Sequence, residues 1–350
     1  MNIEQLLQLT IERKASDLHI LAEQFPTLRI DGELYQLNTF PRLTNTVSHD
    51  MLMPLLSQEQ NNDLMANKEI DFGYEYKGAR FRVNIYHSRK TLAASFRLIP
   101  AAIKTIEQLG LPNSLAQLGN YNQGLVLVTG PTGEGKSTTL ASIINNINNT
   151  KSKHILTIED PIEFVYPTSR SVVSQRELHM DTHSWNIALR SALREDPDVV
   201  LVGEIRDYET AALVLTIAET GHLVFSTLHT NSTTETISRL VDMFPSHQQN
   251  QIRVQLAGTL KAVVAQRLLP RASDRGRVAA IELLYNLPSV AAIIREGKYY
   301  LIDNVLQTSQ AQGLIYFERY LAQLYQNGHI SKEVAAAYAL RPSDLEKYIT

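Results

Sequence analysis

The chain has 350 residues, of which 44% are apolar and 20% are charged, as expected of a globular protein with room for two domains. It has no cysteine, which excludes disulfides, zinc–thiolate sites and thiol nucleophiles, and no apolar run reaches the length of a membrane span. The net charge of −3 comes without a long basic run, so we expect no nucleic-acid partner.

The N-terminal hundred residues predict an α+β domain. Apolar residues at helical spacing indicate a first helix that ends near Lys14. The N-terminal segment lacks the apolar core of a signal peptide, so we expect a cytoplasmic protein. Helical spacing returns from Val47 to Met65, with an interruption near Pro54. Period-two alternation elsewhere predicts short strands over residues 17–21, 27–30, 70–76, 79–87 and 92–98. We predict a first domain over residues 1–100 and a linker over residues 101–122.

A phosphate-binding loop is the strongest motif. The residues from Gly130 to Ser137, GPTGEGKS, match the pattern G-x-x-x-x-G-K-[ST] between a strand candidate and a helix candidate. Glycines let backbone N–H groups close around phosphate oxygens, and the following helix N-terminus favours negative charge. The expected nucleotide contacts are Gly130, Pro131, Thr132, Gly133, Glu134, Gly135, Lys136, Ser137 and Thr138.

The side chains of this loop predict the cofactors. Lys136 is expected to reach the β- and γ-phosphates and the Ser137 hydroxyl to bind Mg²⁺, so we expect ATP and Mg²⁺. Glu134 places a carboxylate inside the loop. Because it would repel a phosphate, we expect its side chain to point outward.

Beyond residue 123, strand and helix candidates alternate. They cover residues 125–129, 137–147, 154–158, 184–193, 199–202, 208–219 and 223–226. This order predicts an α/β domain over residues 123–350, with a mainly parallel sheet and nucleotide at the carboxyl ends of its strands. Beyond Ser246 we expect mostly helices and one strand, from Val278 to Leu284.

Three acidic or histidine clusters follow strands that are expected to end beside the loop. In the first, Glu163 is expected to position or deprotonate the attacking water; in the second, Glu204 follows an apolar strand and is expected to organise Mg²⁺. These two acid roles are interchangeable at this stage. His229 is expected to sense the γ-phosphate at the end of the third strand, whereas for His222 nucleotide binding and a structural role stay open.

The motifs resemble those of the secretion ATPase family, and within it the motors that retract type IV pili. GPTGEGKST, ILTIEDPIEF, SALREDPDVVLVGEIRDYET and ETGHLVFSTLHT are similar to the Walker A, Asp, Walker B and His boxes of that family. The resemblance covers nearly the whole chain. It implies a PAS-like N-terminal domain, a RecA-like ATPase domain and a hexameric ring in which the first domain of one subunit packs on the ATPase domain of the next.

The resemblance also implies the biological role and the partners. It implies an ATPase that powers pilus retraction and twitching motility, placed peripherally at the inner membrane with an inner-membrane platform protein and related pilus ATPases. Arginines are suited to couple subunits, because a guanidinium can report a γ-phosphate across an interface. Arg82 and Arg97, in the family-like segments RFRVN and FRLIP, are the candidates, while Arg190, Arg194 and Arg206 are expected to form salt bridges near the Walker B strand.

The chain departs from the family pattern at two places. Glu134 stands where the loop usually has Ser, and in the segment SVAAIIRE Ala291 and Ala292 replace an Arg-Asn pair linked to retraction. The alternatives are therefore a pilus assembly or type II or IV secretion ATPase, a RecA-like nucleic-acid translocase, and a regulatory subunit that binds nucleotide without turnover. Residues 341–350 indicate no role.

Overall fold

The computed structural model describes residues 2–30, 32–99, 102–273 and 276–349. The chain divides into two compact units: unit 1 comprises Met1–Ala102 and Asp160–Val165, and unit 2 comprises Ile103–Glu159 and Tyr166–Thr350. The expected boundary between first domain and linker, at residues 100 and 101, lies outside the described residues. Within the described parts of the chain, no helix is long and apolar enough to cross a bilayer.

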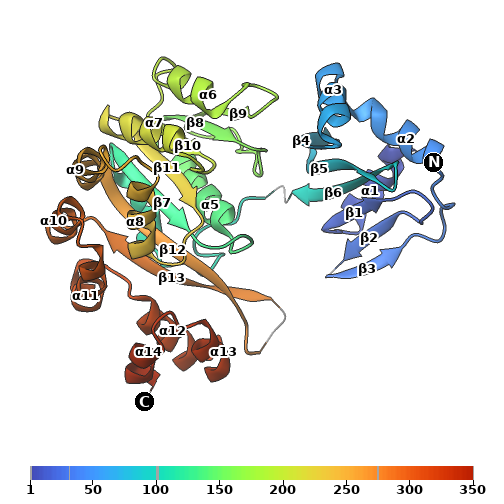
Figure 1. The fold of residues 1–350 in the computed structure, drawn as a ribbon. Helices are drawn as coiled ribbons and strands as arrows, with labels where there is room; N and C mark the ends of the chain where they lie inside the picture. Colours follow the sequence, from blue (N-terminus) through green and yellow to red (C-terminus); the bar gives the residue numbers. More distant parts are fainter. Residues whose placement is uncertain (1, 31, 100–101, 274–275, 350) are drawn as a thin grey trace. The chain divides into compact units, whose positions relative to one another are not determined.

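Unit 1 is built on a six-stranded antiparallel sheet with the order β3-β2-β1-β6-β5-β4 (Figure 1). Its strands are β1 (Asp17–Ile20), β2 (Thr27–Ile30), β3 (Glu33–Gln36), β4 (Glu69–Tyr76), β5 (Ala79–Ser88) and β6 (Thr91–Ile99), and its helices are α1 (Ile3–Glu12), α2 (Asn45–Leu52), the 3-10 turn η1 (Met53–Leu55) and α3 (Gln58–Asn67). The inward side chains of these elements form one apolar core. The predicted α+β domain is confirmed.

Strand β3 has no counterpart in the prediction. All four of its residues are exposed, including the large apolar side chains Leu34 and Tyr35. The strand therefore shows no alternation of buried and exposed positions, and such alternation was the signal used to predict strands.

Unit 2 is built on a seven-stranded sheet with the order β13-β12-β7-β11-β10-β8-β9, parallel throughout except between β12 and β13. Its strands are β7 (Gly124–Thr129), β8 (His154–Glu159), β9 (Val172–Glu177), β10 (Val199–Val202), β11 (Leu223–Leu228), β12 (Leu260–Pro270) and β13 (Arg277–Tyr285). The predicted α/β fold with a mainly parallel sheet is confirmed.

Helices cover both faces of this sheet (Figure 1). They are α4 (Ser114–Gln117), the turn η2 (Leu118–Asn120), α5 (Lys136–Thr150), α6 (Trp185–Ala192), α7 (Tyr208–Glu219), α8 (Thr233–Asp242), α9 (Gln249–Thr259), α10 (Pro288–Glu296), the turn η3 (Tyr299–Leu301), α11 (Ile302–Thr308), the turn η4 (Gln310–Gln312), α12 (Phe317–Gln326), α13 (Lys332–Tyr338) and α14 (Pro342–Ile349). Alternate residues of the central strands face opposite cores: Leu125 and Leu127 pack with α6 to α11, whereas Val126 and Val128 pack with α5.

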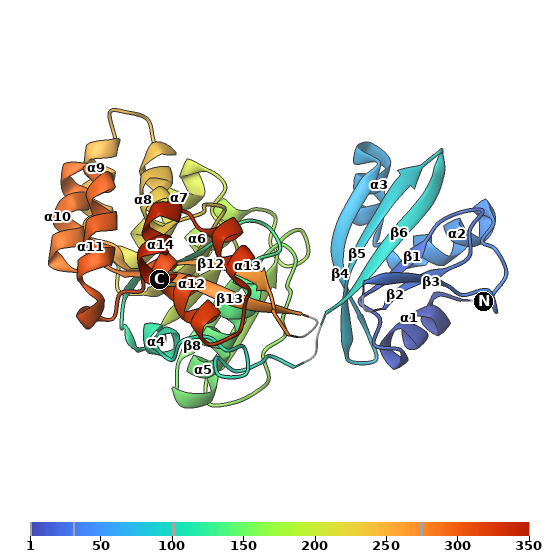
Figure 2. The ribbon, with the colours of Figure 1, turned by 90° about the horizontal axis from the view of Figure 1, so that it is seen from below.

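The C-terminal helices form two groups. Helices α9, α10 and α11 lie next to one another and pack on the core that contains Leu125 and Leu127 (Figure 2). Helices α12, α13 and α14 pack instead around Leu269, Val278 and Ala280 of the long hairpin β12–β13. The hairpin therefore connects the central sheet to the last three helices.

The expectation of a single strand beyond Ser246 is wrong. In addition to β13, the chain forms the eleven-residue strand β12, which pairs in parallel with β7. Strand β12 is buried over most of its length, and its sequence is mostly apolar without period-two alternation. Periodicity does not distinguish such a strand from a buried helix.

Candidate functional site

The carboxyl ends of four neighbouring strands meet at one edge of the unit 2 sheet. Thr129 ends β7 and pairs with Leu228, the last residue of β11. One strand further, Val202 of β10 pairs with Ser226 of β11 on one side and with Ile158 of β8 on the other. The phosphate loop and the residues that follow β10 and β11 therefore lie along the edge at which β8 also ends, as the parallel order predicted.

The phosphate loop begins with a glycine that the structure requires. Gly130 has φ +148°, and a Cβ at this position would collide with the backbone carbonyl of Gln266 on β12. Gly135 has φ +79° and is the N-cap of α5, so that helix begins at Lys136. The glycines thus allow a close passage along β12 and a sharp entry into α5.

Lys136 is buried, and its ammonium group lies inside the loop. The Nζ atom donates hydrogen bonds to the carbonyl oxygens of Gly130 at 2.8 Å and Pro131 at 2.9 Å. Ser137 and Thr138 follow, half-buried, in the first turn of α5. A cation and two hydroxyl groups are thus presented at a helix N-terminus, where negative charge is stabilised.

The carboxylate of Glu134 is turned toward β12. Its Oε2 atom accepts a hydrogen bond from the backbone N–H of Leu268, and the side chain is half-buried. The carboxylate is therefore hydrogen-bonded to the backbone of β12.

Two residues of the hairpin β12–β13 hold the loop, and sequence reasoning missed both. The amide of Gln266 donates to the carbonyl oxygen of Glu134 at 2.7 Å and accepts from Thr139 Oγ1 at 2.7 Å. Arg277 donates to the carbonyl oxygen of Gly133 at 3.2 Å. Because β12 was not predicted as a strand, no pattern placed Gln266 beside the loop. Arg277 lies just before the strand predicted from Val278 to Leu284, and its contact with the loop spans 144 positions.

Glu204 follows β10 directly after Gly203. A Cβ on Gly203 would lie 3.2 Å from the side chain of Trp185 of α6, which is tighter than ordinary contact, and 3.4 Å from the carbonyl oxygen of Ile158. The carbonyl oxygen of Gly203 also accepts a hydrogen bond from Thr227 Oγ1 at 2.7 Å. Glycine stands here where many phosphate-loop enzymes have aspartate, so Glu204 is the acid that follows this strand.

The carboxylate of Glu204 has two basic partners. It forms a salt bridge with Arg206, and its Oε2 atom lies 3.2 Å from Nε2 of His229. Burial raises the pKa of Glu204, but Arg206 and His229 together outweigh that effect and hold the pKa below its ordinary value. Glu204 is therefore ionised at neutral pH. Of the three arginines expected to form salt bridges here, Arg206 does so, whereas among the described residues Arg190 and Arg194 do not, and Arg190 donates to Asn186 Oδ1 at 2.6 Å.

The two histidines lie at opposite ends of β11. His229 follows the carboxyl end of the strand, next to the phosphate loop and in contact with Glu204. His222 precedes the strand, where its Nδ1 atom lies 3.1 Å from the carbonyl oxygen of Ile217 and 3.3 Å from Thr220 Oγ1. The structure therefore brings His229 to the predicted site and places His222 at the other edge of the sheet, in a local contact with the end of α7.

Glu163 belongs to the short segment that groups with unit 1. In that unit, Arg80 Nε donates to the carbonyl oxygen of Ile162 at 3.1 Å. Arg82 binds Asp71 through Nε at 2.9 Å and Nη2 at 2.5 Å. The bond to Asp71, opposed by burial, raises the pKa of Arg82, and the carboxylate of Glu163 adds to the increase.

Arg97 is the other arginine singled out from the sequence. Its Nε atom donates to Asp17 Oδ1 at 3.0 Å, across the pairing of β6 with β1. Arg82, Arg97 and Glu163 are thus members of unit 1, whereas the phosphate loop, Glu204 and His229 are members of unit 2. The predicted site residues therefore divide into two groups, one in each unit.

Comparison with known proteins identifies a family and a well-matched structure. The sequence profile of the family described as type II/IV secretion system protein matches residues 1–337. The chain is 44% identical to the type IV pilus retraction ATPase PilT of Pseudomonas aeruginosa, over 98% of this chain and all of that protein. It is 37% identical to the type IV pilus ATPase PilU of the same organism, over all of this chain and 91% of PilU.

The fold is also similar to a solved structure, the crystal structure of the pilus retraction motor PilT with bound ADP. The TM-score is 0.92 and the identity 44%, and the match covers 99% of both chains. The similarity therefore includes both units and the phosphate loop, and the matched protein binds an adenine nucleotide.

Proposed function

The chain belongs to the family of type II/IV secretion system proteins, and we propose that it is the ATPase that retracts type IV pili and so drives twitching motility. The observation that carries the proposal is the common edge at which the phosphate loop meets Glu204 and His229, in a chain similar to PilT over nearly its full length. The same edge argues against a regulatory subunit without turnover, because it carries acidic and histidine side chains in addition to a phosphate cradle.

The loop and α5 bind the triphosphate. Backbone N–H groups of the loop surround the phosphates, and Lys136 exchanges its contacts with Gly130 and Pro131 for phosphate oxygens. The hydroxyl of Ser137 and the ionised carboxylate of Glu204 are oxygen donors of the kind that Mg²⁺ prefers. When bound there, Mg²⁺ would neutralise charge on the β- and γ-phosphates.

Glu204 and Glu163 divide the remaining acid roles. A carboxylate with a lowered pKa is a weak proton acceptor, because an efficient general base has a pKa near the working pH. This favours Glu204 as the charged ligand and leaves Glu163 to position or deprotonate the attacking water. His229, in contact with Glu204, reports the presence of the γ-phosphate to the Walker B end of β10.

The motor works as a homohexamer at the cytoplasmic face of the inner membrane, with an inner-membrane platform protein as its partner. Arg82 and Arg97 couple the subunits: each is held by one carboxylate of its own unit and retains guanidinium donors for a second acceptor. Cleavage of ATP where two subunits meet then changes the relative position of neighbouring domains, and that movement performs the mechanical work.

Phosphate release by the purified protein tests the enzymatic part of the proposal. Wild-type protein is expected to release phosphate from ATP, and Lys136→Ala to lower kcat by about 100-fold or more, because the charge on the phosphates loses its fixed cation. Lys104→Ala, at an exposed position of the connecting segment, is the matched control and should keep the wild-type rate. Wild-type protein that binds ATP and releases no phosphate would overturn the proposal in favour of a regulatory subunit.

A further inference from the structure

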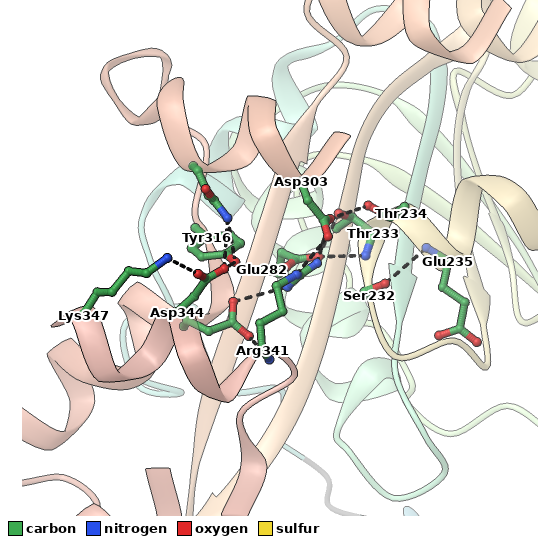
Figure 3. Close-up of polar contacts among 12 residues, drawn as sticks. Ser232, Thr233, Thr234, Glu235, Glu282, Asp303, Tyr316, Arg341, Asp344 and Lys347 are labelled. Atoms are coloured by element: carbon green, nitrogen blue, oxygen red, sulfur yellow. Dashed lines mark hydrogen bonds and ion pairs between the residues drawn. The ribbon is translucent and has the colours of Figure 1, made fainter. Parts of the chain in front are cut away.

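A cluster of three carboxylates surrounds Arg341, just before α14 (Figure 3). The guanidinium lies 2.7 Å from Asp303 of α11, 3.2 Å from Glu318 of α12 and 3.4 Å from Glu282 of β13. The side chains of Glu282 and Glu318 are completely buried. One arginine therefore compensates the negative charge of acids from three different elements. Two of these acids have no access to water.

The carboxylates of this cluster also hold the first turn of α8. Glu282 Oε1 accepts hydrogen bonds from the backbone N–H of Thr233 at 2.9 Å and from its hydroxyl at 2.8 Å. Thr234 Oγ1 donates to Asp303 at 2.9 Å (Figure 3). The beginning of α8 is thus held by two acids that also pair with Arg341.

The first turn of α8 is connected to the nucleotide edge by a few residues. Thr233 follows His229 by four positions, and Thr236 of the same turn donates to Thr129 Oγ1, the residue before the phosphate loop, at 3.2 Å. Thr236 also shares a hydrogen bond of 2.7 Å with Thr230. Polar contacts therefore run from Arg341 through Glu282 and α8 to the end of β7 and to the residue after His229.

We propose that Arg341 is a positioning residue for ATP hydrolysis. Its ion pair holds the Glu282 carboxylate in contact with Thr233, and thereby holds the segment from His229 to Thr236 in the geometry that lets His229 meet the γ-phosphate. Without the arginine, two buried carboxylates face each other and Asp303 with no cation, and an uncompensated buried charge is strongly unfavourable. The arrangement also links the C-terminal helices to the catalytic edge, since any shift of α11 or α12 changes the contacts of Arg341.

The inference rests on the proposed ATPase function, and the variants separate the two. Arg341→Gln removes the cation. The triple variant that adds Glu282→Gln and Glu318→Gln also removes both buried charges, while it keeps side-chain oxygens that can accept from the backbone N–H groups of Thr233 and residue 341. Arg319→Gln, at an exposed position of α12, is the matched control. Arg341→Lys keeps one positive charge but concentrates it on a single nitrogen without the planar guanidinium fork, and it serves if Arg341→Gln does not fold.

Three measurements are made on the purified full chain: kcat and KM for ATP, the affinity for ADP, and hydrogen exchange of peptides covering residues 229–236. For Arg341→Gln we expect kcat to fall about tenfold or more, ADP affinity to change by less than about threefold, and the Thr233 amide to exchange faster. In the triple variant kcat should recover to within about threefold of wild type, because neither buried carboxylate is left without a cation. Arg341→Lys should show the same changes as Arg341→Gln, with a smaller loss of kcat.

The inference is overturned if Arg341→Gln, or Arg341→Lys in its place, keeps wild-type kcat and exchange. It is also overturned if ADP affinity falls in parallel with kcat, or if the triple variant does not recover, since either result indicates general damage to the fold. Faster exchange at Thr233 in Arg341→Gln would still be expected if the wild-type chain lacked ATPase activity. In that case the proposed function would fail while the positional link from Arg341 to α8 stood.

Discussion

Nε2 of His229 lies 3.2 Å from Oε2 of Glu204, and this contact joins the residue after β11 to the acid after β10. Glu204 is bound at the same time by Arg206. The side chain proposed to sense the γ-phosphate therefore touches the carboxylate proposed to organise Mg²⁺, so the two should contribute to catalysis as a coupled pair.

A double-mutant cycle on Glu204→Gln and His229→Asn measures that coupling. Because the two side chains are in contact, we expect their effects on kcat/KM for ATP to be non-additive by about 1 kcal/mol or more. The cycle Glu204→Gln with His222→Asn is the control, because His222 lies at the opposite end of β11, and it should be additive. Additive effects in the first cycle would show that the contact has no part in catalysis.

Alanine at Gly130 and at Gly258 should have opposite effects on stability. At Gly130 the new Cβ would meet the carbonyl oxygen of Gln266 at positive φ, so we expect a loss of about 2 kcal/mol or more together with weaker nucleotide binding. At Gly258, in α9, no atom lies within 4 Å, and we expect a gain of about 0.5–1 kcal/mol. Urea unfolding measures both; equal stability of the two variants would contradict the close passage of the loop along β12.

Gln266→Leu tests whether β12 holds the phosphate loop. The substitution leaves the Thr139 hydroxyl and the Glu134 carbonyl without the partner that they share, at a cost of about 1–3 kcal/mol. If half of that cost falls on the nucleotide-binding conformation, ADP binding weakens by several-fold, up to about tenfold. Calorimetric titration with ADP checks this, and Gln326→Leu on the exposed surface of α12 should bind ADP as the wild type does.

Glu163→Gln tests the assignment of the base. The amide keeps the size of the side chain but cannot accept a proton, so phosphate release should fall by about 100-fold or more while ADP affinity stays within about threefold. Glu75→Gln, at an exposed position of β4 in the same unit, is the control. If Glu163→Gln turned over ATP at nearly the wild-type rate, the base role would pass to Glu204.

Local patterns were sufficient to predict most of the fold. The alternation over residues 79–87 became β5, the loop with Lys136 lies between β7 and α5, and the helix from Tyr208 to Glu219 has the predicted bounds. In these stretches the periodicity or the motif lies within a few consecutive residues, and one face of each element is buried. The same holds for Glu204 and His229, because parallel strands end at a common edge.

Features that depend on distant residues could not be predicted in this way. The contact of Gln266 with Thr139 spans 127 positions, and it requires β12 to be recognised as a strand. Residues 160–165 group with unit 1 although their neighbours on both sides belong to unit 2. Arg341 lies in a segment with no motif, and its importance emerges only when three elements bring their carboxylates to it.

The most direct test of the central claim counts surface pili and measures twitching in a strain whose only copy of this chain carries Lys136→Ala. If ATP cleavage at this loop powers retraction, pili are still assembled but not withdrawn, so the cells should carry more pili than the wild type and should not twitch. Cells without pili would contradict the account, because that result would mean that the motor drives assembly.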